Sequence, residues 1–528
     1  MNQDWHILLL QIGIFSPLLG IPFIALLSQQ VARYLGLFCT GIPLVAGIIL
    51  HLAYDPSATE AGVTMQGFFL FEQIAWMVSD SMNIQYMIGV DGVSAYLLLL
   101  TALIFPILVL YNWNRGPQQE KLFYGMLLLL ETGLLGFFVS LDLLMFYIFF
   151  EIVLIPTAFF IGIWGGERRN DAALKFFIYT LAGSLLMLVA LMYVAVHVQE
   201  GYLTTDYFEI KAALTSGAFT ATELGWLFFG FFIAFAIKVP LVPLHTWQAL
   251  TYSQASTTGS VILAALLSKM GAYGLIRIVL PLFPGVSAEY AGVIAAFAVI
   301  SILYGAYLAV VQTDLKRLIA FSSLSHLGFI VLGIFSFTPE ALSGAVLQMI
   351  AHGVSTAAMF LLAGMLMDRK ASRTIGDFQG IARLAPGFTI LFLITILSSV
   401  GLPGLSGFVG EFMILVGAFN SDVIGGIFAI LAAMAVIIAA VYLMNLFRKT
   451  MFGPTTDDLQ ERITDLHSRE VWLLMPLVVL MFVIGLWASP FLQAIDHGSQ
   501  QILEEVSQST DPQQKASSAG LVFTDPHQ

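Results

Sequence analysis

The stretch FFIAFAIKVPLVPLHTW, residues 231–247, decides the fold of this chain. It begins as an apolar helix, places Lys238 among apolar neighbours and then contains Pro240 and Pro243. Each proline lacks an N–H donor and leaves a carbonyl one turn earlier without its helical hydrogen bond. A lysine at bilayer depth costs about 2.5–3.5 kcal/mol, so it needs a buried partner or water. The stretch therefore predicts a broken membrane helix on an ion path.

The composition of the whole chain is that of a polytopic membrane protein. Its 528 residues are 59% hydrophobic and 10% charged, and their mean hydropathy is +0.90. The single cysteine, Cys39, excludes an intrachain disulfide and a four-cysteine cluster. The sequence has no Walker A motif, no dinucleotide-binding glycine motif and no HExxH pattern. We expect no nucleotide, flavin, cluster or metal in this chain and no nucleic-acid partner.

A count of apolar segments predicts an all-α fold with about 14 membrane spans. The first apolar run has no basic region before it and is expected to be a retained helix. The acidic segment from Tyr54 to Asp91 is expected to be a loop, and the residues from Gln493 onward a flexible polar tail. Two spans are expected to be broken, one near 238–243 and one at VGLPGLSG, residues 400–407.

Spacing between polar residues indicates an internal repeat. Lys238 and Glu411 are 173 residues apart, and Glu151 and His326 are 175 apart. Two offsets this close favour two copies of a five-helix unit. Because five is an odd number, the second copy begins on the opposite side of the membrane, so the two copies are inverted. The alternative is coincidence among few polar positions. We divide the chain into residues 1–121, 122–280, 281–450 and 451–528, with the two copies in the second and third parts.

Basic residues predict the orientation of the bundle. Most of the 21 Lys and Arg residues fall in alternate short loops, whereas the other side holds Lys211, Arg277 and Lys515. Because basic loops stay in the cytoplasm, both termini are expected to face away from it.

Glu151 and Lys238 are predicted to form a functional pair. Glu151 lies between MFYIFF and IVLIP, and its alternative role is that of a neutral, hydrogen-bonded core acid. Burial disfavours the charged form of each group, while an opposite charge nearby favours it. Such a pair can switch its protonation when its members move apart.

Two further spans carry one charged residue each. Lys269 lies in the middle of LLSKMGAYG, with Tyr273 on the same helical face, and only a position near a helix end would let it reach the interface. Glu411 follows the second break in GFVGEFMIL, where the alternative is a charge stabilised by the start of a helix. We predict a functional role for both.

Three histidines are weaker candidates. His326 and His352 each lie on a polar stripe of an apolar helix, and His245 follows Lys238 by seven residues. A satisfied packing histidine is the simpler interpretation, yet histidine titrates near neutrality and can connect acids to lysines.

Three other charged residues are harder to interpret. Lys316, beside Asp314 and Arg317, is either a cytoplasmic charge or a site of proton uptake. Glu131 in LLLLETGLLG is another acid within a span, and Asp142 is expected to cap a helix.

Six segments in order resemble the antiporter-like membrane subunits of respiratory complex I, over nearly the whole chain. They are LLMFYIFFEIVLIP, FFIAFAIKVPLVPLHTW, LLSKMGAYGLIR, QTDLKRLIAFSSLSHLGF, QMIAHGVSTAAMFLLAG and GLPGLSGFVGEFMIL. The glutamate in GEFMIL is similar to the M type, since the sister L and N types have lysine there.

The resemblance implies a proton-translocating subunit of NADH:quinone oxidoreductase in a bacterial inner membrane, with both termini periplasmic. It implies that other subunits handle NADH, flavin, iron–sulfur clusters and quinone (ubiquinone or another), and that L-like and N-like subunits and membrane lipid are the partners. The implied proton relay consists of Glu151, Lys238, Lys269, His326, His352 and Glu411, with His245 and Lys316 as further candidates.

One segment departs from the family pattern. Where similar subunits continue HTW with LPDAH, this chain has QALTY, residues 248–252, and a later PTAGS reads STTGS, residues 256–260. The departure puts the contacts of that loop in doubt. Two other functions remain open: a subunit of a multisubunit cation/proton antiporter, and a structural spacer in a membrane arm.

Overall fold

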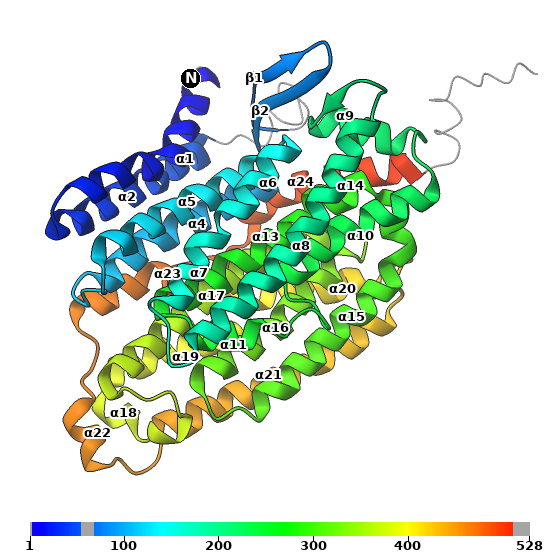
Figure 1. Ribbon diagram of the computed structural model, residues 1–528. Helices are drawn as coiled ribbons and strands as arrows, with labels where there is room; N and C mark the ends of the chain where they lie inside the picture. The colour runs from blue at the N-terminus through cyan, green and yellow to red at the C-terminus, as the bar shows by residue number, and fades with distance from the viewer. Residues whose placement is uncertain (1–2, 54–67, 511–528) are drawn as a thin grey trace, which may run out of the picture.

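The structure is a computed structural model that describes residues 3–53 and 68–510. Within these ranges, 13 helical segments are long and apolar enough to cross a membrane. The remaining predicted span consists of two shorter apolar helices, α19 (Pro386–Val400) and α20 (Ser406–Phe419). The predicted polytopic helical fold is therefore confirmed (Figure 1).

The other helices and strands follow one another in chain order. The first half comprises α1 (Gln3–Leu26), α2 (Gln29–Ala53), β1 (Leu70–Ser79), β2 (Met82–Val90), α4 (Gly92–Asn112), α5 (Glu120–Val139), α6 (Leu143–Ile152), α7 (Leu154–Gly162), α8 (Arg169–His197), β3 (Leu203–Thr204), α9 (Tyr207–Thr215) and α10 (Ala221–Lys238). The middle comprises α11 (Gln248–Gln254), α12 (Thr257–Ile262), the π-helix η2 (Leu263–Leu267), α13 (Ser268–Gly274), the π-helix η3 (Leu275–Val279), α14 (Leu280–Leu282), α15 (Pro284–Val310), α16 (Leu315–Ile334) and α17 (Pro339–Lys370). The remainder comprises η4 (Ile375–Asp377), α18 (Ile381–Leu384), α21 (Ile427–Met451), α22 (Asp457–Arg462), α23 (Ser468–Leu486) and α24 (Ser489–Thr510).

Three spans form the centre of the bundle. The apolar windows of the α12–α14 span and of α17 are 100% buried inside the protein, and that of α16 is 94% buried. The corresponding windows of α1 and α2 are only 33% and 28% buried. Side chains on the three central spans are therefore shielded from the hydrocarbon of a bilayer.

Both predicted interruptions are present. Helix α10 ends at Lys238, and the chain forms no further helix until α11 begins at Gln248. The second break lies between α19 and α20, where Gly401 and Gly404 have φ values of 82° and 94°. Only glycine adopts this left-handed region without strain, so these two glycines permit the turn. Lys238 lies directly before the first break, and Glu411 lies after the second. The inverted repeat of two five-helix units stays a prediction.

The expectation of an all-α chain was wrong for part of the acidic segment. Residues 70–90 form an antiparallel hairpin, β1 with β2, joined by a two-residue turn at Asp80 and Ser81, and β3 adds a short third strand. Runs such as IAWMV and NIQYMI are rich in the β-branched and aromatic residues that favour strands. A search for membrane spans does not test for these short runs. Residues 54–67 of the segment lie outside the described residues.

The expectation of a flexible tail from Gln493 onward was also wrong. Helix α24 runs to Thr510 and packs against α4, α14, α15 and α17. Its buried residues Ala494, Ile495, Ile502 and Val506 recur at helical spacing. This apolar stripe is narrow and lies among polar residues, which explains why composition alone indicated a tail. The expected tail beyond Thr510 lies outside the described residues.

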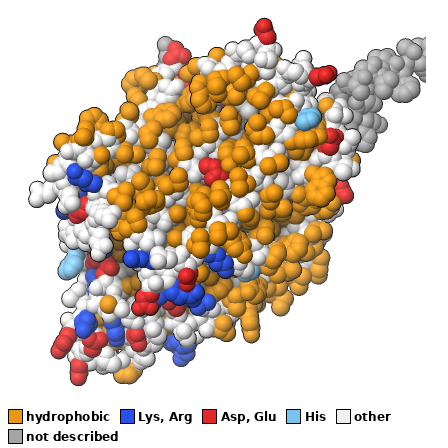
Figure 2. Space-filling model, viewed as in Figure 1, with side chains coloured by type: hydrophobic (Ala, Val, Ile, Leu, Met, Phe, Trp, Pro, Cys, Tyr) orange, Lys and Arg blue, Asp and Glu red, His pale blue; other side chains and the backbone are white. Residues whose placement is uncertain are grey.

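Charged side chains separate to the two ends of the bundle. On the face in Figure 2, hydrophobic side chains cover the middle, and Lys and Arg gather toward the end that carries α18 and α22. The hairpin lies at the opposite end (Figure 1). This distribution agrees with the basic loops counted in the sequence.

We expect the Asp465→Ala variant to be less stable by about 0.5–2 kcal/mol, the range for the loss of a helix cap. The Asp465 carboxylate accepts hydrogen bonds from the backbone of Gly387 and Phe388, at 2.8 and 2.9 Å, where α19 begins. Burial raises the pKa of Asp465, but these N–H donors outweigh it and hold the pKa below its usual range. Stabilisation by the carboxylate is thus present above the unfolded-state pKa and is lost as pH falls through the folded-state pKa.

Thermal unfolding in detergent, at neutral and acidic pH, measures this effect. Asp422 is exposed between α20 and α21, and its replacement by Ala serves as the control. An Asp465→Ala variant as stable as the parent at neutral pH would show that the cap contributes nothing.

Candidate functional site

The centre of the site is a widened helical turn in the most buried span. Between α12 and α13 the backbone forms the π-helix η2, a feature that frequently marks functional positions in helices. Two carbonyls of this turn accept side-chain donors: Leu263 from the Tyr252 hydroxyl at 3.0 Å, and Ala264 from Lys269 Nζ at 2.6 Å. The widened turn therefore holds a lysine inside the protein.

Lys269 is fully buried and has three polar contacts. Besides the Ala264 carbonyl, Nζ contacts Ser268 Oγ at 3.4 Å and His352 Nδ1 at 2.6 Å. An ammonium has three N–H donors, so all three are used here. No carboxylate contacts Lys269 among the ion pairs of the described residues. A proton on Lys269 is thus hydrogen-bonded but not neutralised, and His352 is placed to receive it.

His352 lies next to a second histidine, His326, which in turn contacts an acid, Glu411. The rings of His352 and His326 have centroids 5.6 Å apart. His326 Nδ1 lies 2.6 Å from Glu411 Oε1, and the same oxygen accepts a hydrogen bond from Gln348 Nε2 at 2.9 Å. All of these side chains are buried. The structure thus brings four predicted residues, from α13, α17, α16 and α20, into one array.

Lys238 and Glu151 form a looser pair. Lys238 is buried, with Nζ 4.5 Å from the centre of the Phe150 ring, and it interacts electrostatically with Glu151. The two are not among the ion pairs within 4.0 Å that the described residues make. Glu151 is half-buried, and its Oε1 has no hydrogen-bond partner there. The pair is thus close enough to interact electrostatically without forming a direct ion pair.

Lys316 is not a surface charge. Its Nζ is buried and donates to the Ala255 carbonyl at 2.9 Å and to Ser260 Oγ at 3.1 Å. It also lines an open polar cavity of about 460 Å³, together with residues of the loops that follow α4, α7 and α17. The cavity connects Lys316 to the end of the bundle where the basic loops lie.

Three other residues from the sequence lie outside the array. His245 is half-buried after the break in α10, with its ring edge-on to Tyr304 at 5.2 Å. Glu131 is fully buried in α5, and neither carboxylate oxygen has a hydrogen-bond partner among the described residues. Asp142 caps α6 by accepting from the backbone of Leu144 and Met145, as predicted.

Sequence reasoning missed a buried ion pair and misplaced one of its members. Arg277, assigned to a loop, is buried in η3 and contacts Asp91, which caps α4. Arg277 also donates to the Tyr273 hydroxyl at 3.2 Å. Lys269, Tyr273 and Arg277 are spaced four residues apart on one helical face. That spacing was the signal that could have placed Arg277 inside the span.

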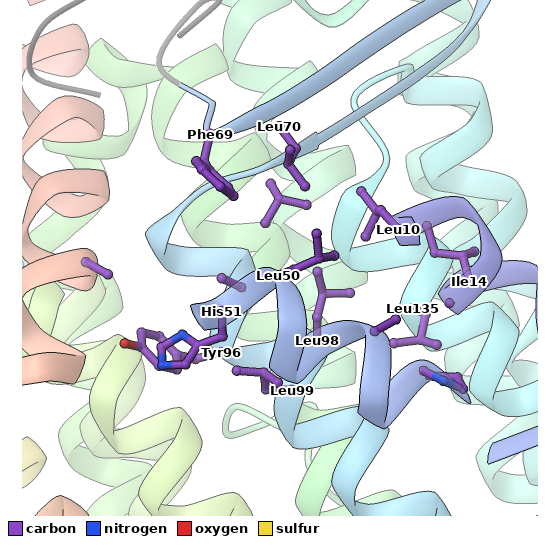
Figure 3. Close-up of a pocket in the computed structure, with 17 residues that line it drawn as sticks. Leu10, Ile14, Leu50, His51, Phe69, Leu70, Tyr96, Leu98, Leu99 and Leu135 are labelled. Carbon is purple, nitrogen blue, oxygen red and sulfur yellow. The ribbon is translucent and has the colours of Figure 1, made fainter. Parts of the chain in front are cut away.

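A separate cavity lies among the N-terminal helices (Figure 3). Its volume is only about 50 Å³, and its lining is mostly apolar, with Leu10, Ile14, Leu98 and Leu135 among the residues. His51 and Tyr96 meet ring to ring at 5.3 Å on its border. No lysine or carboxylate of the described residues lines it, so it is no part of the array. Within residues 3–53 and 68–510, no group of three or more His, Cys, Asp or Glu side chains could hold a metal ion.

Comparison with known proteins agrees with this fold. Residues 140–439 match the protein family described as NADH:quinone oxidoreductase/Mrp antiporter, transmembrane. NADH-quinone oxidoreductase subunit M of Rickettsia prowazekii is 34% identical over 501 residues, covering 94% of this chain and 98% of the relative. Subunit M of Rhodobacter capsulatus is 36% identical over 501 residues, covering 91% and 93%.

Two solved structures share the fold. A chain of respiratory complex I from Thermus thermophilus with bound NADH has a TM-score of 0.82 and 32% identity, covering 94% of this chain and 99% of that chain. A chain of the Mrp complex from Dietzia sp. has a TM-score of 0.79 and covers 94% and 99%, but its 20% identity supports likeness of fold alone.

Fold and site together define a polytopic membrane protein of the antiporter-like class, with interrupted helices and a buried array of titratable side chains. The chain belongs to the NADH:quinone oxidoreductase/Mrp antiporter family of membrane subunits. Within that family it is similar, over nearly its whole length, to subunit M of NADH-quinone oxidoreductase, and the resemblance drawn from the six sequence motifs is confirmed.

Proposed function

We propose that the chain is a proton-translocating subunit of a bacterial NADH:quinone oxidoreductase. The observation that carries this proposal is the buried array from Lys269 through His352 and His326 to Glu411, whose two outer contacts are both 2.6 Å long. A hydrogen bond this short lets a proton pass between the two groups without diffusion of either. The similarity to subunit M chains supports the assignment to this complex.

The chain's own residues would move the proton in steps. The polar cavity admits a proton to Lys316, and Lys269 passes one to His352. The ring of His352 gives it to His326, a step that needs ring rotation or a bridging water because the ring centroids are 5.6 Å apart. Glu411 then accepts it from His326. The proposed route thus runs from Lys316, near the basic end of the bundle, to Glu411, in the second broken helix.

Glu151 and Lys238 supply the switch. With the Glu151 carboxylate nearby, the buried ammonium of Lys238 is stabilised; when the carboxylate moves away, burial favours the neutral amine and the proton leaves. A conformational change arriving from a neighbouring subunit would provide this movement. The half-buried position of Glu151 supports the idea that a neighbour reaches it.

The proposal includes the surroundings of the chain. It places the protein in the inner membrane with both termini in the periplasm, beside L-like and N-like subunits. The chain carries no redox centre of its own, and NADH, flavin, iron–sulfur clusters and quinone are bound by other subunits. The basic loops at one end of the bundle support the orientation.

Affinity purification of the tagged chain in mild detergent tests the proposal against a cation/proton antiporter subunit. A complex I subunit is expected to bring down flavin, iron–sulfur absorbance and NADH:quinone reductase activity. An antiporter subunit would bring down other membrane chains without these cofactors. The second candidate is favoured by the likeness of fold to the Mrp complex, and Glu411 disfavours it because the sister L and N types, which antiporter subunits resemble, have lysine there.

A further inference from the structure

A gap separates the two lysines of the proposed route. Lys316 Nζ contacts the Ala255 carbonyl and Ser260 Oγ, and Lys269 Nζ contacts the Ala264 carbonyl, Ser268 Oγ and His352. These two sets of partners within the described part of the chain do not overlap. Tyr252 of α11 contacts one residue of each set, since its carbonyl accepts from Ser260 Oγ and its hydroxyl interacts with Ser268. It belongs to the segment QALTY, in which the sequence departs from its family pattern.

Tyr252 lies on the Lys269 side of the gap. It is fully buried, and its hydroxyl donates to the Leu263 carbonyl of the π-helix η2 at 3.0 Å. The hydroxyl also interacts with the side chains of Ser268 and Gln248. Since Ser268 Oγ is itself 3.4 Å from Lys269 Nζ, one hydroxyl group separates Tyr252 from Lys269.

Gln248 and Ser260 lie on the Lys316 side. Gln248 is fully buried, and its Nε2 donates to the Ala320 carbonyl at 3.2 Å, one turn after Lys316 in α16. Its Oε1 has no hydrogen-bond partner among the described residues. Ser260 Oγ, which accepts from Lys316, donates to the Tyr252 carbonyl at 2.8 Å. Two polar contacts thus lead from the helix of Lys316 to α11.

We propose that the Tyr252 hydroxyl, held by Gln248, is the proton-transfer step between Lys316 and Lys269. A hydroxyl can accept a proton on a lone pair while it donates its own, so it conducts without a net change of charge. The Lys316 ammonium loses a proton to a water bound by Gln248 Oε1, and the water gives a proton to Tyr252. Once the two hydroxyls turn away from the Leu263 and Ala264 carbonyls to which they donate, Tyr252 passes its own proton to Ser268, and Ser268 gives one to the neutral Lys269 amine.

Protons and charges balance in this step. One ammonium becomes an amine at Lys316, one amine becomes an ammonium at Lys269, and Tyr252, Ser268 and the water end as they began. A buried amide oxygen without a protein partner is a suitable anchor for the water, because buried polar atoms bind ordered water where protein donors are lacking. The inference rests on the proposed function, since it adds a step to the same route.

The Tyr252→Phe variant of the whole complex tests the step in inside-out membrane vesicles. This variant keeps the ring and loses only the hydroxyl. We therefore expect NADH-driven proton uptake to fall at least about tenfold, a smaller loss than the full contribution that a positioned proton-transfer group typically makes. The Tyr252→His variant is expected to recover much of the uptake, because imidazole also donates and accepts. A structural role for the ring would give no such recovery.

Matched variants separate the failure of this step from the failure of the proposed function. Tyr96→Phe removes a hydroxyl that also donates to a backbone carbonyl, but to that of Pro490 at 3.0 Å and not to one of the π-helix η2, and it is expected to keep full uptake. Full uptake in Tyr252→Phe together with its loss in Lys238→Met would overturn the Tyr252 step alone. Full uptake in both would overturn the proposed function as well.

If the Tyr252→Phe complex does not assemble, variants of Gln248 test the same proposal. Gln248→Leu removes the amide and keeps an apolar side chain of similar size, and it is expected to lower uptake by at least about tenfold for the same reason. Gln248→Glu keeps a carbonyl oxygen at this position and is expected to retain more uptake than Gln248→Leu. Unchanged uptake in an assembled Gln248→Leu complex would overturn the proposal.

Discussion

Replacement of Lys238 by methionine is expected to abolish NADH-driven proton uptake while the complex still assembles. Methionine fills the buried site beside Phe150 but cannot carry a proton, so nothing remains for Glu151 to stabilise. We expect a loss of at least about 100-fold, equivalent to roughly 2.7 kcal/mol in the barrier of the transport step. Uptake is measured in inside-out vesicles with a pH-sensitive dye, and assembly by native gel electrophoresis.

A surface lysine provides the control for this variant. Lys449 is exposed at the end of α21, and Lys449→Met removes the same charge without touching the array. Its uptake should equal that of the parent. If Lys238→Met also pumped at the parent rate, the switch assigned to Glu151 and Lys238 would be wrong.

Replacement of Glu411 is expected to separate its two roles, as a proton carrier and as a hydrogen-bond acceptor. Glu411→Gln keeps an oxygen for His326 and Gln348 but cannot release a proton, so we expect uptake to fall at least about tenfold with little change in stability. Glu411→Ala leaves both donors without an acceptor, which typically costs about 1–3 kcal/mol for each buried polar group. A lower apparent Tm is therefore expected only for the alanine variant.

Proton uptake and thermal unfolding, measured on the same preparations, check the expected loss of uptake in Glu411→Gln and the expected lower Tm of Glu411→Ala. Glu340 is exposed in the first turn of α17, and Glu340→Gln is the matched control that should change neither quantity. Normal uptake in Glu411→Gln would show that the proton leaves the array at another residue.

The sequence predicted the membrane spans and both interruptions because each has a local cause. Apolar runs of sufficient length must cross a bilayer, and Pro240, Pro243, Gly401 and Gly404 interrupt helices through their own backbone chemistry. Charged residues in apolar runs were visible for the same reason. Six motifs in the expected order also indicated the family, which the comparisons confirmed.

Where prediction failed, the signal was not local. The apolar runs of β1 and β2 are too short to be recognised as spans, and the strands are fixed by pairing with each other. Helix α24 is too polar to be recognised as a span and is stabilised by packing on other helices. Arg277 looked like a loop residue because its partner, Asp91, is 186 positions away. The sequence left open whether Lys316 is a cytoplasmic charge or a site of proton uptake, because Ala255 and Ser260, which contact it, belong to another part of the chain.

The sequence by itself determined that this is a polytopic membrane protein with two broken helices and a set of buried charged residues. Hydropathy, proline and glycine act within a few residues, so the amino-acid order is sufficient for these features. Only the tertiary structure decided which of the charged residues meet. Lys269, His352, His326 and Glu411 come from four different helices, and their contacts depend on how those helices pack. The same packing places Tyr252, which belongs to the divergent segment QALTY and to which the sequence assigned no role, in contact with partners of both lysines of the proposed route.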